Sequence, residues 1–211
     1  HLRLQRRLQA LYGARAAGLL EEIVSIVDRH ALRTGAAEEL WSQRDVALIT
    51  YGDMIRAEGE APLVTLRRFL ADELADEISI VHVLPFFPWS SDDGFSVIDY
   101  RDVDPVLGEW EDLTELGRDF RLMADLVANH CSSESDWFAD LLADREPGRR
   151  FFVTADPEAD LSQVVRPRCQ PLLTRYETAA GGRWVWTTFS ADQVDLDYRE
   201  PAVLLEMLDV L

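Results

Sequence analysis

The sequence predicts an α/β fold in which parallel strands alternate with helices. Three short apolar runs, residues 46–51, 79–84 and 121–128, have the length and composition of strands that are buried on both faces. Leucines at helical spacing separate these runs at residues 63–75 and 111–118. This alternation is typical of consecutive βαβ units. Because the chemistry of such folds lies at the carboxyl ends of the strands, the residues just after each run are candidates for a site.

Residues 1–45 are predicted to form a helical extension packed on the main domain. A broad apolar stripe at helical spacing runs through residues 19–31, and Gly35 is a suitable helix stop. Nothing in this region suggests chemistry. The main domain is therefore expected to begin with the run at residue 46 and to continue through its first three strands to residue 130.

The alternation of strands and helices changes after His130. We expect an insertion over residues 131–190 and a return toward the main domain over residues 191–211. In chain order, the expected elements are a short helix at 136–145 capped by Ser135, an irregular stretch at 146–180, a strand at 184–189, a loop at 193–198 and a helix that begins at Pro201.

The composition excludes several classes of partner. Lys plus Arg is 21 and Asp plus Glu is 39, so the net charge is 21 − 39 = −18. Such an acidic chain is not expected to bind nucleic acid or anionic membranes. Two cysteines, Cys131 and Cys169, are too few for a disulfide framework and have no metal-binding spacing. No apolar run is long enough to cross a bilayer, and a cytoplasmic location is expected.

The loop after residues 79–84 combines aromatic and polar side chains. Phe86, Phe87 and Trp89 precede a Ser-Ser-Asp-Asp-Gly-Phe segment that contains Asp92. Ring faces beside hydroxyls and carboxylates suit a sugar, which stacks its C–H face on a ring and needs polar partners for its hydroxyls. The alternative is a covered loop with core aromatics and an ordinary turn. Asp92 and His130 both follow predicted parallel strands, so both are expected on the same rim of the sheet.

Several motifs in this order resemble the α-amylase superfamily, glycoside hydrolase family 13. Asp125-Leu-Val-Ala-Asn-His130 looks like the family's first signature motif at the end of the third barrel strand. The stretches Leu48-Ile-Thr-Tyr51 and His82-Val-Leu-Pro-Phe-Phe87 are similar to the sucrose-phosphorylase branch. Also similar are the Arg-Pro-Arg triplet ending at Arg168, the Trp-Val-Trp strand that begins at Trp184 and Gln193-Val-Asp-Leu-Asp-Tyr198. The helical extension and the segment 88–100 look more like the glucosylglycerate-phosphorylase type.

The resemblance implies a partial (β/α)8 TIM barrel, namely its first three βα units with an insertion after the third strand. It implies that Asp92 and His130 hydrogen-bond the glucosyl unit beside the scissile bond and that Phe95 lines that subsite. Arg168 matches an arginine near the phosphate or the leaving group, and a guanidinium presents a fork suited to either. Val165 stands where sucrose phosphorylases tend to have a tyrosine, which argues against sucrose as the substrate.

The implied activity is phosphorolysis of an α-glucoside with retention of configuration. Phosphate is then a co-substrate, and neither a metal nor an organic cofactor is implied. The nucleophilic Asp, the acid/base Glu and a third carboxylate are expected beyond Leu211, so the 211-residue chain is expected to be inactive, with an open sheet edge at its third strand. The alternatives are a hydrolase or sucrose-type transglucosidase of the same superfamily, a non-catalytic carbohydrate-binding member, and an unrelated α/β domain.

Overall fold

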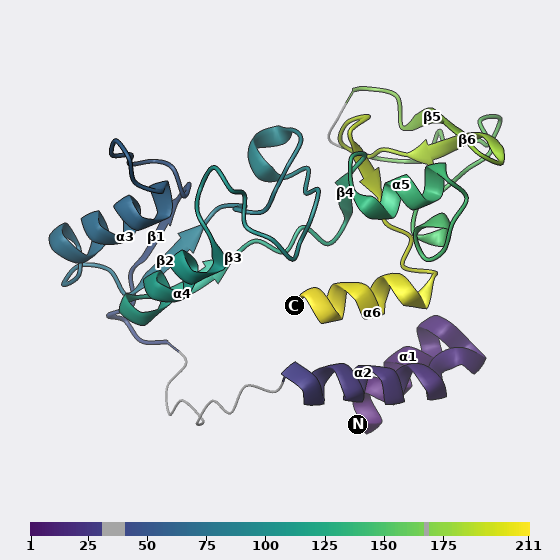
Figure 1. Ribbon diagram of the computed structural model, residues 1–211. Helices are drawn as coiled ribbons and strands as arrows, with labels where there is room; N and C mark the ends of the chain where they lie inside the picture. Colours follow the sequence, from purple (N-terminus) through teal and green to yellow (C-terminus); the bar gives the residue numbers. More distant parts are fainter. Residues whose placement is uncertain (31–40, 167–168) are drawn as a thin grey trace. The chain divides into compact units, whose positions relative to one another are not determined.

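A computed structural model describes residues 1–30, 41–166 and 169–211 (Figure 1). The chain divides into two units, which are described separately. One unit comprises Ala36–Val127, and the other comprises His1–Gly35 together with Ala128–Leu211.

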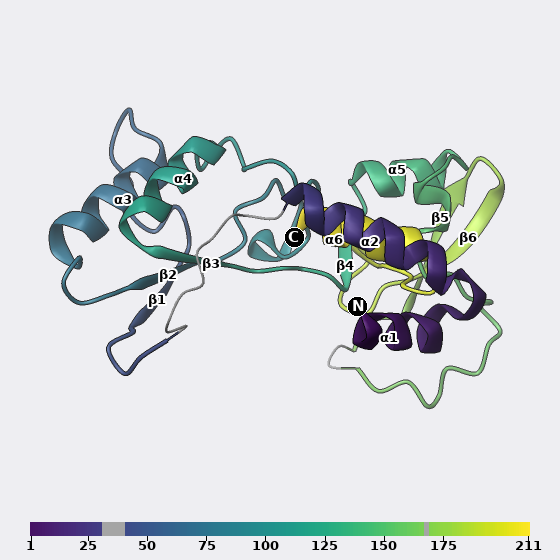
Figure 2. The same ribbon diagram turned by 90° about the horizontal axis from the view of Figure 1, so that it is seen from below.

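A three-stranded parallel sheet organises the Ala36–Val127 unit. Its strands are β1 (Ala47–Thr50), β2 (Ile80–Val83) and β3 (Arg121–Ala124), in the order β1-β2-β3. The helices α3 (Pro62–Glu73) and α4 (Trp110–Asp119) connect them and lie together on one side of the sheet (Figure 2). The predicted βαβ units are therefore confirmed.

The two faces of this sheet differ in burial. Val81 and Val83 of β2 are buried beneath α3 and α4, which bury Leu66 and Leu116 in return. Residues in register with His82 lie on the other face, where Ile49 of β1 is 62% exposed and Met123 of β3 is 48% exposed. The prediction of strands buried on both faces is thus wrong for the described residues: both connecting helices cover the same face, and the edge strand β3 is exposed on either face, with Leu122 in register with Val81 but 41% exposed.

The strand predicted over residues 121–128 is shorter than expected. Strand β3 ends at Ala124, and the chain then extends to a separate strand, β4 (His130–Ser132), in the other unit. Asp125 follows the end of β3, and its Oδ2 lies 2.9 Å from Nε2 of His82 on the neighbouring strand.

The second unit contains small antiparallel sheets and four α-helices within its described residues. Strand β4 pairs with β7 (Gln193–Asp195), and β5 (Leu173–Thr178) pairs with β6 (Gly181–Trp186). The helices are α1 (Leu2–Tyr12), α2 (Ala16–His30), α5 (Asp136–Leu142) and α6 (Pro201–Val210), with short 3-10 turns at Gly13–Arg15 and Gly148–Arg150. Ser135 caps α5 as predicted, since its hydroxyl accepts the backbone N–H of Phe138 at 3.2 Å.

Three further predictions need correction, two in this unit and one at residues 41–45 of the Ala36–Val127 unit. The stretch 146–180, predicted to be irregular, contains β5, and the stretch 193–198, predicted to be a loop, begins with β7. Strand β7 has only three residues and pairs with the remote strand β4, whereas β5 has six residues and forms a hairpin with β6, which follows it directly. Residues 41–45, predicted to continue the helical extension, are not helical, and the predicted stop at Gly35 lies outside the described residues.

The N-terminal helices pack on α6. Leu8, Tyr12, Leu19 and Ile23 form a buried cluster. Leucines 204, 205 and 208 of α6 pack against this cluster, and α6 lies between α2 and the rest of this unit in Figure 1. The opposite side of α6 buries Val203 and Met207. Helix α6 is therefore apolar on two sides, which explains why this unit includes both ends of the chain.

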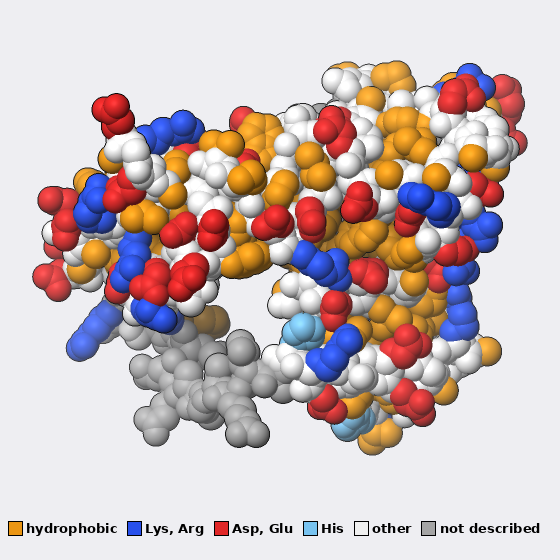
Figure 3. Space-filling view, viewed as in Figure 1, with side chains coloured by type: hydrophobic (Ala, Val, Ile, Leu, Met, Phe, Trp, Pro, Cys, Tyr) orange, Lys and Arg blue, Asp and Glu red, His pale blue; other side chains and the backbone are white. Residues whose placement is uncertain are grey.

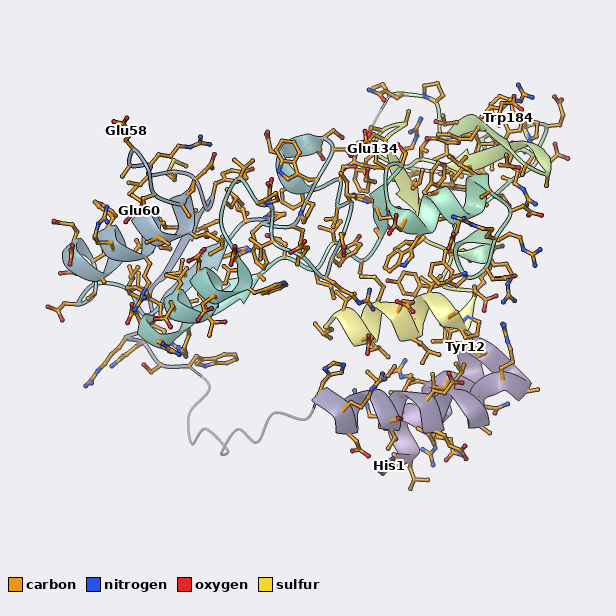
Figure 4. All side chains as sticks on the ribbon, viewed as in Figure 1. His1, Tyr12, Glu58, Glu60, Glu134 and Trp184 are labelled. Carbon is orange, nitrogen blue, oxygen red and sulfur yellow. The ribbon has the colours of Figure 1, made fainter. Side chains whose placement is uncertain are left out.

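The hydroxyl of Tyr12 joins the two ends. It donates to the carbonyl of Tyr198 at 2.8 Å, and the ring lies at the packed side of the N-terminal helices (Figure 4). A Tyr12→Phe substitution keeps the ring and removes only this bond, so the free energy of unfolding should fall by about 1 kcal/mol. Urea denaturation of the two proteins measures the difference; an unchanged midpoint and slope would show that water replaces the bond without loss.

Acidic side chains are spread over the face shown in Figure 3, in both units. Many are paired with arginines; Arg67, for example, contacts Glu115 at 2.9 Å and Asp119 at 2.7 Å. No helix among the described residues is long and apolar enough to span a membrane.

Candidate functional site

The loop over residues 88–98 carries two of the predicted site residues. Its arms are joined by backbone hydrogen bonds from Ile98 to Pro88 at 2.7 Å and from Ser90 to Ser96 at 3.1 Å. At its tip, Asp92 begins a 3-10 turn and is exposed. Phe95 follows the turn and is half-buried. Asp92 and Phe95 thus lie on one hydrogen-bonded loop at the carboxyl end of β2, as predicted.

The tip of this loop has an unusual backbone conformation. Asp92 and Asp93 have φ of 57° and 50°, and Gly94 has φ of 98°. A Cβ at Gly94 would lie 2.8 Å from the carbonyl oxygen of Pro85, so only glycine fits there. Consecutive left-handed residues that are not glycine are uncommon, and such conformations are concentrated at functional sites.

The three aromatic residues before the tip divide into two groups. Phe86 and Phe87 are buried, and the ring of Phe86 contacts that of Trp110 edge-on at 5.8 Å between centroids. The ring of Phe87 lies 5.9 Å from that of Tyr100. These two rings therefore belong to the hydrophobic core, as the alternative interpretation of this loop expected for its aromatic residues. Trp89 is 40% exposed and is the aromatic of this group that can meet a ligand.

His130 begins β4 in the other unit and is 6% exposed. Its Nε2 lies 3.2 Å from the amide nitrogen of Gln193 on β7, which can donate to it in the tautomer that leaves Nε2 unprotonated. The ring of Phe189 lies 5.0 Å from the imidazole. Asn129 places its amide nitrogen 3.5 Å from Nδ1. In that tautomer Nδ1 carries the proton and faces a second donor at Asn129, so the orientation of the imidazole is set by its contacts with Gln193 and Phe189.

Asp195 pairs with His130 across the β4–β7 ladder and is 8% exposed. Its carboxylate accepts the backbone N–H of Thr188 at 3.1 Å and also the Thr188 hydroxyl. Burial raises the pKa of this carboxyl above its ordinary value, although the bonds from Thr188 act in the opposite direction. A buried carboxyl in direct register with the predicted sugar-binding histidine was not recognised in the sequence.

Replacing Asp195 by asparagine tests this raised pKa. Because the folded protein holds the proton to higher pH than the unfolded chain, the parent loses stability as the pH rises from about 4 through the raised pKa. The amide of the D195N variant has no such titration, so the stability of D195N relative to the parent should increase between about pH 4 and neutrality. Urea denaturation of both proteins across this range is the measurement, and a constant or decreasing difference would contradict the raised pKa.

The structure brings some predicted site residues together and not others. Asp92 and Phe95 share one loop of the Ala36–Val127 unit, whereas His130 belongs to the other unit, so their meeting stays a prediction. Arg168 lies outside the described residues. Its neighbour Arg166 donates to the carbonyl of Thr188 at 3.3 Å. Gln193 and Phe189, which contact His130, were missed because residues 193–198 were interpreted as a loop and Phe189 only as part of a strand.

The described residues contain no group of three or more His, Cys, Asp or Glu side chains arranged to hold a metal. Both cysteines are free: Cys131 is buried and Cys169 is exposed. Burial raises the pKa of the Cys131 thiol to about 12, so it is an unreactive part of the core.

Comparisons with known proteins agree on one family. The family described as "Alpha amylase, catalytic domain" matches residues 77–211. A glucosylglycerate phosphorylase of Allomeiothermus silvanus is 52% identical over 204 residues, which is 95% of this chain and 36% of that protein. A sucrose phosphorylase of Bifidobacterium adolescentis is 36% identical over 163 residues, which is 72% of this chain and 32% of that protein.

A solved structure shows the same relationship in three dimensions. The crystal structure of sucrose 6F-phosphate phosphorylase from Thermoanaerobacter thermosaccharolyticum has a TM-score of 0.70 and 29% sequence identity. The match covers 83% of this chain and 38% of that chain. The chain thus spans about a third of the length of the proteins that it matches.

Proposed function

Because the chain belongs to the α-amylase family and is similar to phosphorylases of that family, we propose that it is part of a retaining, α-glucosyl-transferring sugar phosphorylase. The observation that carries the proposal is the 52% identity to a glucosylglycerate phosphorylase over nearly the whole chain. The lower identity to a sucrose phosphorylase supports glucosylglycerate as the preferred substrate. These relatives favour a phosphorylase over a hydrolase, a transglucosidase or a non-catalytic binding protein.

In this proposal, β1, β2 and β3 are the first three strands of a (β/α)8 barrel. Their parallel order and their connecting helices support this assignment. Residues 131–190 are an insertion after the third strand, and α6 belongs to the return toward the barrel. The substrate subsite then forms at the carboxyl ends of the strands, where TIM-barrel enzymes place their chemistry.

We assign the glucosyl-binding role to Asp92, Phe95 and His130. A carboxylate can accept hydrogen bonds from two sugar hydroxyls, and an oriented imidazole can donate or accept one. Both become stronger partners as the sugar ring gains positive charge in the transition state. The exposure of Asp92 and the fixed orientation of His130 support these roles. Arg168 is assigned to phosphate or to the glycerate carboxylate.

The reaction proceeds through two displacements. An enzyme carboxylate attacks the anomeric carbon while a carboxylic acid protonates the departing oxygen, and phosphate then releases the glucosyl group with retention as glucose 1-phosphate. We assign these carboxylates to parts of the full-length protein outside this chain. The partners are a small α-glucoside and phosphate, no cofactor is needed, and the location is cytoplasmic.

Product analysis of the full-length protein tests the proposal. Glucosylglycerate and sucrose are each supplied with and without inorganic phosphate, and glucose 1-phosphate and free glucose are measured. We expect glucose 1-phosphate from glucosylglycerate only when phosphate is present. Free glucose released at the same rate without phosphate would identify a hydrolase, and faster turnover of sucrose would reverse the substrate assignment.

A further inference from the structure

A cavity of about 420 Å³ lies in the Ala36–Val127 unit, on the Trp89 side of the loop 88–98. It is bounded by the segment that follows β1, by the loop that follows β2 and by residues 104–107. Asp93 lines it, whereas Asp92 and Phe95 are not among its lining residues. The volume is within the range of small-molecule sites. The cavity is therefore a second feature of this loop, separate from its predicted glucosyl-binding side.

The walls of the cavity are held by the fold. The backbone N–H of Leu63 in α3 donates to the carbonyl of Leu107 at 3.1 Å, and Asp104 donates its N–H to Phe86 at 2.8 Å. Gly52 is buried against these leucines, and a Cβ there would lie 3.1 Å from Cδ2 of Leu63. The cavity is thus formed before any ligand arrives.

Three lining side chains are available to a ligand. Trp89 presents a ring that is 40% exposed, Tyr51 is half-buried, and Asp93 is exposed on the left-handed turn. Within the described part of the chain, the Trp89 indole N–H, the Tyr51 hydroxyl and the Asp93 carboxylate have no protein hydrogen-bond partner. A ring face beside a donor, a hydroxyl and a carboxylate suits a sugar, which offers C–H and O–H groups together.

The charge of the lining selects against anions. Asp53, Asp93 and Asp104 carry three negative charges and Arg56 carries one positive charge, so the sum is 1 − 3 = −2. Arg56 is already paired with the carboxylate of Asp53 and is not free to hold a second anion. Glu58 lies on the same segment before α3 and adds negative charge there (Figure 4), whereas the carboxylate of Glu60 is paired with Arg68. Such a lining repels phosphate and carboxylate ligands and accepts neutral ones.

We propose that this cavity is a binding subsite for a neutral pyranose ring, which stacks on Trp89 and bonds its hydroxyls to Tyr51 and Asp93. The subsite goes beyond the proposed phosphorolysis. Its ligand is a neutral sugar unit, and binding of this unit needs no catalytic turnover. It would let the protein hold an uncharged saccharide beside the loop that carries Asp92.

The indole N–H signal of Trp89 in the ¹⁵N-labelled full-length protein gives a local readout. The signal is assigned by its loss in Trp89→Phe, and methyl α-glucoside is titrated without phosphate up to about 100 mM, which covers millimolar affinities. We expect a saturable shift of this signal. Glucose 1-phosphate, the anionic probe, should need at least about tenfold more ligand for the same shift, as expected for charge repulsion in a partly exposed site.

Two variants separate this subsite from the predicted glucosyl site. Asp93→Asn keeps the left-handed turn and removes a charge-assisted bond, so the midpoint of the titration should rise about tenfold. Asp92→Asn should leave the midpoint unchanged. The proposal is overturned if the Trp89 signal does not move in the parent, or if its movement disappears in Asp92→Asn. Absence of phosphorolysis would contradict the proposed function but not the subsite, because the titration contains no phosphate.

Discussion

Asp92→Asn in the full-length protein should lower kcat/KM for phosphorolysis about 100-fold or more while changing stability by less than about 0.5 kcal/mol. The carboxylate is assigned to the glucosyl hydroxyls, so its charge matters most when the ring becomes positive in the transition state. Asparagine is the suitable replacement because Asp92 has a φ of 57°, a conformation that asparagine also adopts readily.

The matched control is Asp72→Asn. Asp72 is an exposed residue of α3, so this variant makes the same change of charge in the same unit. Steady-state kinetics and thermal melts of the three proteins should show a loss of turnover in Asp92→Asn only. If Asp92→Asn melts much lower while its folded fraction turns over normally, Asp92 is a turn former and the assigned role is wrong.

Gly148→Ala should destabilise the unit that contains α5 by about 3 kcal/mol or more. A Cβ at this position would lie 2.0 Å from the carbonyl oxygen of Trp137 and 2.7 Å from Cβ of Asp140, and both belong to α5. A backbone carbonyl cannot rotate away as a side chain could. The 3-10 turn at Gly148–Arg150 would have to separate from the helix, and the buried Phe151 that follows it would move as well.

Gly18→Ala is the matched control for this substitution. Gly18 lies in α2 of the same unit, and a Cβ there meets nothing within 4 Å. Alanine should therefore stabilise the helix by about 0.5–1 kcal/mol. Urea denaturation of both variants measures the contrast, and a Gly148→Ala protein with the stability of the parent would mean that α5 and the turn can separate without loss.

The sequence predicts the parallel unit well because its signals are local. Leucines at helical spacing indicate α3 and α4, and the apolar runs indicate β1 and β2, each within a few residues of the observed bounds. Which face of the sheet is covered depends on the placement of both helices, which no single segment encodes. The exposure of Ile49 and Met123 was therefore not predictable from their own strands.

Strand β7 was missed because its partner is remote in the sequence, whereas β5 was missed although its partner β6 follows it directly. Strand β7 has only three residues and pairs with β4, and Asp195 is buried only because that pairing forms. The resemblance to a known family indicated Asp92, Phe95 and His130 where local chemistry left alternatives open. It did not indicate the contacts of His130 with Gln193 and Phe189. The first contact depends on the antiparallel pairing of β4 with β7, and the second depends on the segment between β6 and β7.

The packing of the N-terminal helices on α6 has a consequence for biosynthesis. Tyr12 and its partner Tyr198 are 186 residues apart, so the ribosome must add nearly the whole chain before α1 and α2 meet the helix that covers them. At about 5–20 residues per second, this interval lasts on the order of 10–40 s. During that time, Leu8, Leu19 and Ile23 present an apolar stripe to solvent without their leucine partners from α6. We therefore expect aggregation of the nascent chain to fall when this apolar stripe is shielded until α6 emerges.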